Sequence, residues 1–469
     1  MIDLDEYRSW DAVAMAELVR SGAVTADELE EASRALLAST ADLNAVGAVA
    51  DPAVAAPAAD DDAPFAGVPF AVKELLAVPG LPWTMGSRLM AHAEAGPPSP
   101  YLERLLEAGL RIVCATTSSE FGLLGSTETL LHGATHNPWG EGLSAGGSSG
   151  GSAALVAAGA VPMAHANDAG GSIRYPASMT GLFGFKPSAH RTEPVGPDLG
   201  GLISLVHEHA VTRTVRDSAA LLAATERRGP GAVHAPVGRI DGPAERRLRF
   251  IVLERTIPGE LPDPEVLAAL RRTADLLEAL GHQRVELPLD PVFDGAALSR
   301  AFFTAAARTM TDVSAMVTPM LGRPPGPDEL EPFTLELIEW AATLGPDEAS
   351  AGEAAFAAAT RNYLGLFLHA DVVLTPTVSR PPWPLGTLAP DLGREELIAR
   401  TEQLIGYTPI HNITGSPAMS VPLEAVAGLP VGMHLAAAPG EEAALLHLAF
   451  ELEEARPWVD RLPFRAEAR

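Results

Sequence analysis

Two segments rich in glycine and serine hold the residues best suited to chemistry in this chain. They are residues 144–152 and residues 167–174, and each places serine beside consecutive glycines. Glycine lets the backbone adopt positive φ and lets several N–H groups converge on one point. Such a group of donors suits a phosphate cradle or an oxyanion hole, and a serine beside it could act as a nucleophile.

Lysine is nearly absent from the chain, which draws attention to the two lysines that remain. Of 33 basic residues, only Lys73 and Lys186 are lysine. A buried lysine can lose its proton near neutral pH, whereas arginine practically cannot. Lys73 ends an apolar run, residues 67–73, that predicts a short buried strand, and its amine is therefore a candidate base. We expect Lys186 to be structural or surface-exposed.

Three other kinds of site compete for these residues. Neither segment has a Gly-Lys-Ser/Thr ending, which disfavours a nucleotide site. Residues 147–151 match a Gly-x-Ser-x-Gly nucleophile elbow with Ser149 as nucleophile and His411 or His434 as base, but a loop precedes them where the elbow requires a strand. The run His207-Glu208-His209 lacks the i, i+4 histidine pair of a zinc helix, which favours a structural role.

Alternating strand-like and helical runs must position the two segments. This alternation is typical of an α/β fold, in which helices flank a sheet. A loop that merely packs a helix on the sheet would not explain two polar Gly-Ser clusters and a lysine at a strand end. The pattern predicts further strands at 111–116, 159–164, 249–253 and 371–376, and helices at 10–20, 25–37, 100–108, 151–158, 215–225, 264–280, 298–316 and 348–368.

We expect one domain over residues 1–469, because no internal repeat or long linker divides the chain. Its expected parts are an N-terminal helical cover (residues 1–60) and a core with both Gly-Ser segments (residues 65–226). A variable segment that forms the substrate pocket (residues 230–370) and a C-terminal part of the core (residues 371–469) follow.

Composition narrows the classes of partner. The 469 residues carry a net charge of -27, which disfavours nucleic acid and anionic membranes as partners. The single cysteine, Cys114, excludes an intrachain disulfide. The first residues lack a basic, apolar leader pattern, and we expect a cytoplasmic protein.

The motifs resemble those of the amidase signature hydrolases. Three family motifs occur in order, at residues 67–73, at residues 146–152 (Gly-Gly-Ser-Ser-Gly-Gly-Ser) and at residues 168–174 (Asp-Ala-Gly-Gly-Ser-Ile-Arg). Further matches reach residues 412–418, so the resemblance covers nearly the whole chain. It implies the amidase signature fold, a large mixed β-sheet with helices on both faces.

The resemblance also implies a catalytic triad of Lys73, Ser148 and Ser172. Ser172 would be the nucleophile, and Ser148, preceded by a cis peptide bond, would relay its proton to Lys73. An amine with an ordinary pKa of about 10.4 can accept that proton near neutrality only if burial lowers its pKa.

The turn around Ser172 would supply the remaining groups, and no metal or cofactor is required. Arg174 is expected to form an ion pair that holds the turn. The oxyanion hole would consist of the N–H groups of Ala169, Gly170, Gly171 and Ser172, with Ser149, Asp168 and Arg174 in supporting roles.

The chain departs from the family's usual residues at Glu74, at Asn167 and at His434. We expect none of these three departures to touch the triad.

The resemblance is strongest to the branch with the cyclic-dimer hydrolases of 6-aminohexanoate, aryl acylamidases and urethanases. It implies an uncharged, fairly apolar amide as substrate, with a carbamate as the alternative. A glutamine amidotransferase subunit is disfavoured by the acidic charge and by the missing Tyr/Arg-rich motif of that subunit at residues 290–340. A non-catalytic binding protein is disfavoured because the triad is intact. We expect the protein to be either a monomer or a homodimer.

Pocket walls are expected from residues 123–132 and 301–368. Apolar residues at helical spacing in the second stretch are candidates for the lining, although such residues are more often core. They are Phe302, Phe303, Met310, Met316 and Met320.

Overall fold

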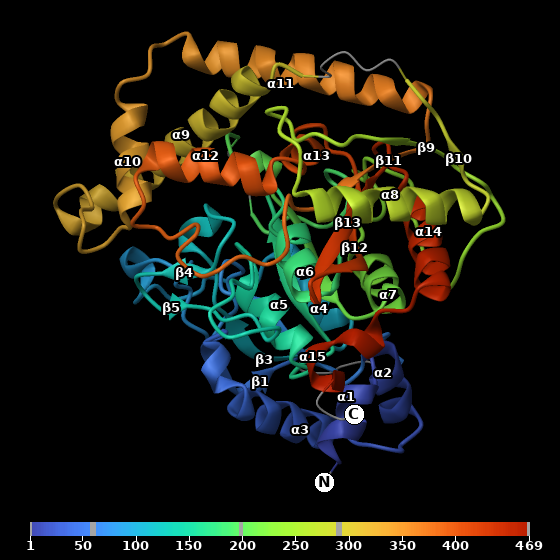
Figure 1. Cartoon of the computed structure of the whole chain (residues 1–469). Coiled ribbons are helices and arrows are strands. Elements are labelled where there is room, and N and C mark those ends of the chain that lie inside the picture. Colours follow the sequence, from blue (N-terminus) through green and yellow to red (C-terminus); the bar gives the residue numbers. More distant parts are fainter. Residues whose placement is uncertain (1, 57–61, 197–199, 288–292, 467–469) are drawn as a thin grey trace.

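One mixed sheet of eleven strands forms the centre of the molecule (Figure 1). The computed structural model describes residues 2–56, 62–196, 200–287 and 293–466. The strands lie in the order β1-β3-β2-β6-β8-β7-β12-β13-β11-β9-β10. Their bounds are β1 Val46–Val54, β2 Pro69–Lys73, β3 Arg111–Thr116, β6 Met163–Asp168, β7 Phe183–Lys186, β8 His207–Thr212, β9 Arg249–Val252, β10 Gln283–Arg284, β11 Val372–Pro376, β12 Ala418–Val426 and β13 Leu429–Ala436; β4 Glu128–Thr129 and β5 Gly133–Ala134 form a separate pair.

The central strands are buried on both faces, because every residue of β2, β8 and β11 is buried. A strand that alternates its side chains between two faces can be buried throughout only when both faces are covered. The sheet is therefore the middle layer of an α/β fold, as the sequence predicted.

Parallel pairing brings two polar strand ends to one edge of the sheet. Strand β2 runs parallel to both β3 and β6. Parallel neighbours end at the same edge, so Lys73 and Asp168, the last residues of β2 and β6, lie at that edge.

Two helices begin at the two Gly-Ser segments and lie against each other on the sheet. Helix α5 (Gly150–Ala157) is buried throughout and contacts β2, β6 and β8, while α6 (Arg174–Thr180) contacts β7, β12 and β13. Glycine permits this close packing, since a Cβ on Gly151 would lie 2.5 Å from the Thr117 hydroxyl oxygen. Contact between α5 and α6 brings the two segments together.

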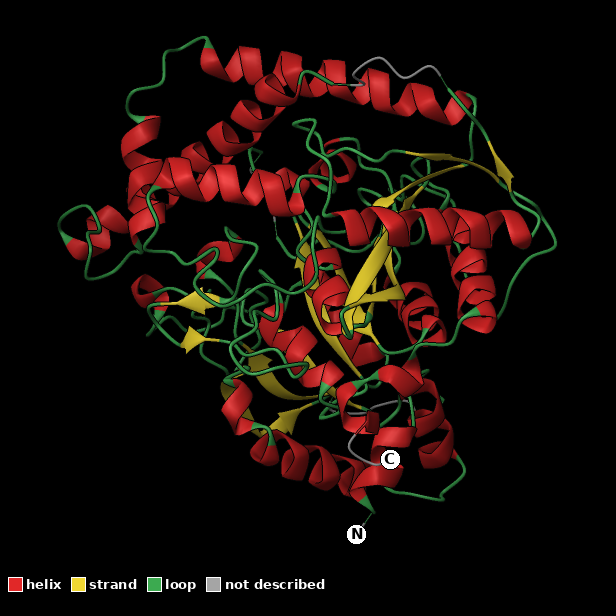
Figure 2. Ribbon diagram, viewed as in Figure 1, coloured by secondary structure: helices red, strands yellow, loops and turns green. Residues whose placement is uncertain are grey.

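The other helices surround the sheet (Figure 2). In Figure 1, α9 to α12 gather in a layer above one end of the sheet, and α9 contacts both α10 and α11. Their bounds are α1 Leu4–Ser9, α2 Ala12–Arg20, α3 Ala26–Ser39, α4 Pro100–Glu107, α7 Val215–Thr225, α8 Pro264–Ala279, α9 Gly295–Leu321, α10 Pro332–Ala341, α11 Glu348–Gly365, α12 Arg394–Ile405, α13 Pro409–Ile413, α14 Glu442–Ala455 and α15 Pro463–Ala466.

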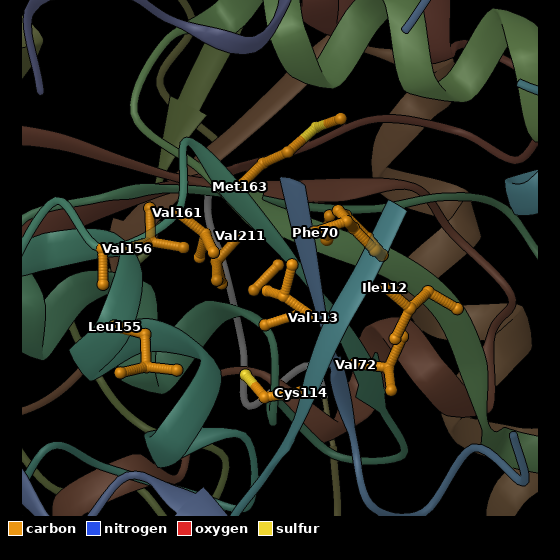
Figure 3. Packing of buried hydrophobic residues seen from close by; sticks show 14 of the residues in the cluster. Phe70, Val72, Ile112, Val113, Cys114, Leu155, Val156, Val161, Met163 and Val211 are labelled. Atoms are coloured by element: carbon orange, nitrogen blue, oxygen red, sulfur yellow. The ribbon is translucent and has the colours of Figure 1, made fainter. Parts of the chain in front are cut away.

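Buried hydrophobic residues from β2, β3 and α5 pack together beneath the strand ends (Figure 3). Cys114 of β3 lies in this cluster, and burial raises the pKa of its thiol to about 12. The thiol is therefore structural, as its apolar surroundings in the sequence indicated.

Several strands differ from the sequence prediction, which placed no strand at β7, β8, β10, β12 or β13. The strand expected at 159–164 is β6, Met163–Asp168, because Gly159 adopts a φ of 76° after α5 and Pro162 cannot donate to a sheet. Strand β1 was missed, since Asp51 and Pro52 are typical of a loop. The segment expected to be a helical cover thus also contains a strand, which pairs with β3 at the edge of the sheet, where proline is tolerated.

Within the described residues, no helix combines the length and the apolar character needed to cross a membrane.

Candidate active site

Lys73 lies fully buried at the end of β2 and contacts two acceptors. Its Nζ lies 2.6 Å from Ser148 Oγ and donates a hydrogen bond to Asn167 Oδ1, also at 2.6 Å. The strand ends explain this arrangement, because β2 and β6 are parallel neighbours and Asn167 is the penultimate residue of β6.

Burial sets the protonation of Lys73. Loss of hydration disfavours the ammonium form and lowers the pKa of Lys73 to about 7, although the nearby carboxylates of Glu208, Asp168 and Glu74 oppose this shift. A large fraction of the amine is therefore neutral at pH 7, and neutral amines can accept protons.

A second buried pair stands behind this lysine. The backbone N–H of Lys73 donates to His165 Nδ1 at 3.3 Å, and His165 Nε2 lies 2.8 Å from Glu208. Because Nδ1 is the acceptor, Nε2 carries the proton and donates it to the Glu208 carboxylate.

Ser148 is held in a closely packed loop before α5. The peptide bond between Gly147 and Ser148 is cis, as the resemblance implied. A Cβ on Gly147 would lie 2.6 Å from backbone atoms of Ser126, so only glycine fits there. Ser148 Oγ lies 3.3 Å from where a Cβ on Gly122 would stand, and Gly122 lines the pocket that Ser172 also lines.

Ser172 lies in the turn between β6 and α6 and lines a pocket. Its side chain is nearly buried, and within the described part of the chain its hydroxyl takes part in no hydrogen bond. The backbone N–H groups of residues 169–172 likewise donate no hydrogen bond to any described group. The turn thus offers a hydroxyl and several free donors to whatever occupies the pocket.

A buried ion pair holds this turn in place. Arg174 Nε and Nη2 donate to the two carboxylate oxygens of Asp168 at 2.9 and 2.8 Å. The guanidinium holds the pKa of Asp168 below its usual range against the opposing effect of burial. The backbone N–H of Ile173 also donates to Asp168, at 3.1 Å. This geometry matches the ion pair expected for Arg174.

The backbone of the turn is fixed from its other side by two hydroxyl groups. Those of Tyr175 and Thr408 both donate to the Gly170 carbonyl oxygen. Gly171 has a φ of 140°, and a Cβ there would lie 2.0 Å from Tyr175 Cζ. Neither Tyr175 nor Thr408 was predicted as a site residue, and Thr408 has no local signal because it reaches the turn from a distant segment.

One expected absence of contact is wrong. Asn167 was expected not to touch the triad, yet its side chain binds Lys73 directly. The parallel strand ends could have shown this, since Lys73 ends β2 and Asn167 is the penultimate residue of its neighbour β6. Glu74 accepts a hydrogen bond from the Ser118 backbone at 2.7 Å, and His434 Nε2 accepts one from Arg174 at 3.0 Å. Within the described part of the chain, neither of these two side chains forms a hydrogen bond with the side chain of Lys73, Ser148 or Ser172.

The nucleophile elbow lacks its base. Ser149 Oγ lies 3.4 Å from the Asn167 carbonyl oxygen, while His411 and His434 both contact Arg174. Burial lowers the pKa of both imidazoles well below the usual value. The structure therefore brings neither histidine to Ser149.

The run His207-Glu208-His209 lies within β8, where alternate side chains point to opposite faces. His209 Nε2 contacts the Ser218 hydroxyl at 2.9 Å, and Glu208 faces His165. These partners fit the structural role that the sequence favoured. Among the described residues, no group of three or more His, Cys, Asp or Glu side chains is placed to hold a metal ion.

Lys186 is fully buried, so the surface-exposed alternative is wrong. Its Nζ donates to the Pro187 carbonyl oxygen at 2.7 Å, and burial lowers its pKa well below the ordinary value. The lysine closes β7 inside the sheet, which fits the structural alternative.

The pocket beside Ser172 has mainly apolar walls. Phe302 and Phe303 line it, as expected, but Met310 is core, and Met316 and Met320 are 66% and 86% exposed at the far end of α9. A 27-residue helix extends beyond the pocket, so only part of its face can line the cavity. Helix α12, which was not predicted as a pocket wall, contributes Thr401, Glu402 and Ile405 to the lining.

The chain is similar to known amidases over most of its length. The family model described as Amidase matches residues 17–446. AmiC of Mycobacterium tuberculosis is 38% identical over 465 residues, which cover 97% of this chain and 96% of that protein.

Two further comparisons concern one kind of enzyme. The 6-aminohexanoate-cyclic-dimer hydrolase of Paenarthrobacter ureafaciens is 35% identical over 97% of this chain and 96% of its own length. A solved structure of 6-aminohexanoate cyclic dimer hydrolase complexed with substrate has a TM-score of 0.87 and 31% identity, and covers 98% of this chain and 99% of that one.

Proposed function

This chain belongs to the amidase signature family and hydrolyses carbon–nitrogen bonds other than peptide bonds, and on this premise we propose that it cleaves fairly apolar amides with Ser172 as the nucleophile. One observation carries the proposal: buried Lys73, with a pKa lowered to about 7, lies 2.6 Å from Ser148 Oγ beside the pocket that Ser172 lines. The apolar pocket wall supports the substrate class.

In the proposed reaction, Ser172 Oγ attacks the amide carbonyl carbon and forms a C–O bond. Its proton passes to Ser148, whose own proton passes to the neutral amine of Lys73. The same route then returns the proton to the departing amine as the C–N bond breaks. Water attacks the resulting acyl ester, which releases the acid and restores Ser172.

The turn of residues 169–172 would stabilise the negative oxygen that forms during attack. Its N–H groups find no partner among the described residues, which supports this role. Each well-placed donor contributes about 3 kcal/mol to the transition state. Asp168 and Arg174 would keep the donors in position, and Ser149, the residue that precedes α5, would support the neighbouring loop.

The test is turnover of four substrates: an aryl amide, a linear aliphatic amide, the cyclic dimer of 6-aminohexanoate and a small aryl carbamate. We expect Ser172→Ala to lose at least about a thousandfold in kcat/KM on every substrate that the wild type cleaves. Ser149→Ala is the matched control and should retain most of the activity. If Ser149→Ala lost its activity while Ser172→Ala kept it, the assignment of Ser172 as the nucleophile would be overturned.

Labelling with a fluorophosphonate gives a second test of the nucleophile. The added mass should map to Ser172 and disappear in Lys73→Ala, which keeps the serine but removes the base. Preference for the carbamate would favour the urethanase alternative, and cleavage of glutamine only with an added partner would favour the amidotransferase alternative. A cytoplasmic location and a monomeric or homodimeric state stay predictions.

A further inference from the structure

The pocket beside Ser172 contains one acidic side chain that the proposed reaction does not use. Glu402 of α12 lines the pocket together with Ser299 of α9. The Ser299 hydroxyl donates a hydrogen bond to Glu402 Oε1. The two helices thus hold a carboxylate at a defined place in a mainly apolar cavity.

Among the residues that the structure describes, no basic side chain forms an ion pair with this carboxylate. The nearest basic residues in sequence on the two helices have other partners. Arg300 pairs with Glu348 at 2.6 Å, and Arg400 pairs with Glu396 at 2.5 Å. The negative charge of Glu402 is therefore left for an occupant of the pocket.

The carboxylate is separated from the Ser172 turn by an apolar stretch. The Phe302 ring lies against the turn, because a Cβ on Gly170 would be 3.0 Å from Phe302 Cζ. Ser299 precedes Phe302 by three residues on one helix face, a distance of about one helical turn.

Helix α12, which contacts α9 through the hydrogen bond between Ser299 and Glu402, repeats this spacing. The Ile405 carbonyl oxygen lies 3.0 Å from the Tyr175 hydroxyl, which also contacts the turn, and Glu402 precedes Ile405 by three residues. Each helix therefore has an apolar residue beside the Ser172 turn, and a polar residue about one helical turn away from that apolar residue. The same pocket is lined by the apolar side chains of Leu298, Phe302, Phe303, Ala306, Ile405 and Ile413.

From this arrangement we propose that Glu402, positioned by Ser299, binds a primary ammonium group at the far end of the substrate's apolar arm. The preferred substrate class is then an ω-amino amide, with the scissile carbonyl at Ser172 and the cation at Glu402. A charge-assisted hydrogen bond between an ammonium group and a carboxylate is stronger than one between neutral groups. This inference rests on the proposed function of Ser172, and it replaces the uncharged substrate that the resemblance implies with one whose apolar arm ends in a cation.

The test compares two substrates that differ only at the end of the arm. In 6-aminohexanoyl-4-nitroanilide the chain ends in an ammonium group, and in heptanoyl-4-nitroanilide it ends in a methyl group. We expect Glu402→Gln to lose about tenfold or more in kcat/KM on the first substrate and little on the second. Ser299→Ala should shift the same ratio in the same direction by a smaller factor.

Glu395→Gln is the matched control, because it removes the same charge from the same helix at a side chain that is 92% exposed. It should leave the ratio of the two rates unchanged. The neutral substrate reports whether each variant is folded and catalytically intact. Equal changes on both substrates in Glu402→Gln would overturn the inference and leave the proposed function standing.

Protection of Ser172 from labelling by a fluorophosphonate tests the ammonium site and the proposed nucleophile separately, even if neither anilide is cleaved. Hexylammonium should slow labelling of the wild type more than 1-hexanol does, and Glu402→Gln should abolish this difference. Equal protection by both compounds would contradict the ammonium site. Absence of labelling at Ser172 in the wild type would instead contradict the proposed nucleophile.

Discussion

At the scale of single residues, two contacts orient the amine of Lys73. A neutral amine has two N–H groups and one lone pair, and the Asn167 side-chain oxygen accepts one of the N–H groups at 2.6 Å. Ser148 Oγ lies at the same distance on another side of the nitrogen. The amide therefore helps to turn the lone pair toward the serine.

The lowered pKa of Lys73 predicts the pH dependence of the reaction. Only the neutral amine accepts a proton, so kcat/KM should rise with pH through about 7 and level off above it. The sign follows from burial, which favours the uncharged form of a base. Lys73→Arg should be inactive at every pH, because the guanidinium keeps its proton.

The two lysines of the chain allow this prediction to be measured directly. With lysine labelled by ¹⁵N at Nζ, only two side-chain signals are expected, and Lys73→Arg identifies the one that belongs to Lys73. That signal should titrate near pH 7. A midpoint near 10, or a flat rate profile between pH 6 and 8, would contradict the role of Lys73 as base.

At the scale of elements, the turn between β6 and α6 depends on close approach. Gly171 has a φ of 140°, which L-residues with a side chain rarely adopt. Tyr175 of α6 and Thr408, which directly precedes α13, both contact the carbonyl of the preceding residue, Gly170. The turn can hold its N–H groups toward the pocket only while no side chain separates it from Tyr175.

We therefore expect Gly171→Ala to lose at least about a hundredfold in kcat. Its Cβ would lie 2.0 Å from Tyr175 Cζ and would displace the donors from the carbonyl oxygen of the substrate. Gly345→Ala, at a position with open space and no positive φ, is the control and should keep normal rates. Retained activity in Gly171→Ala would argue against donors from this turn.

At the scale of the whole molecule, Arg174 connects segments from distant parts of the chain. Its guanidinium contacts Asp168 at the end of β6, Asn412 in α13 and His434 in β13. All four side chains are buried. The same ion pair that holds the Ser172 turn thus also fastens the C-terminal part of the chain to the core.

Arg174→Met should lower the free energy of unfolding by about 3–5 kcal/mol, because it leaves the Asp168 carboxylate buried without its partner. Urea denaturation monitored by circular dichroism measures the change. Arg239→Met, which removes an exposed pair with Asp241, should change stability by at most about 1 kcal/mol. Equal effects of the two substitutions would show that the buried pair contributes no more than a surface one.

Much of the fold was predictable because local patterns specify it. Helix α7 has the bounds Val215–Thr225 that periodicity predicted, and β3 the bounds Arg111–Thr116. Strand β1 escaped because Asp51 and Pro52 fit an edge strand only when a partner is known. Which methionines line the pocket was not predictable. Met310, Met316 and Met320 are equally apolar, but the burial of each depends on what packs against its part of α9.

The sequence by itself indicated the family, and it predicted Lys73, Ser148 and Ser172 as the triad, because these residues lie in short motifs whose glycines and strand ends have local causes. Only the tertiary structure decided which distant groups meet them. Asn167 reaches Lys73 because β2 and β6 are parallel neighbours, and Glu402 reaches the pocket because α12 packs beside α9. Contacts between segments far apart in the chain arise from burial of the whole sheet and its helices, and no local pattern records them.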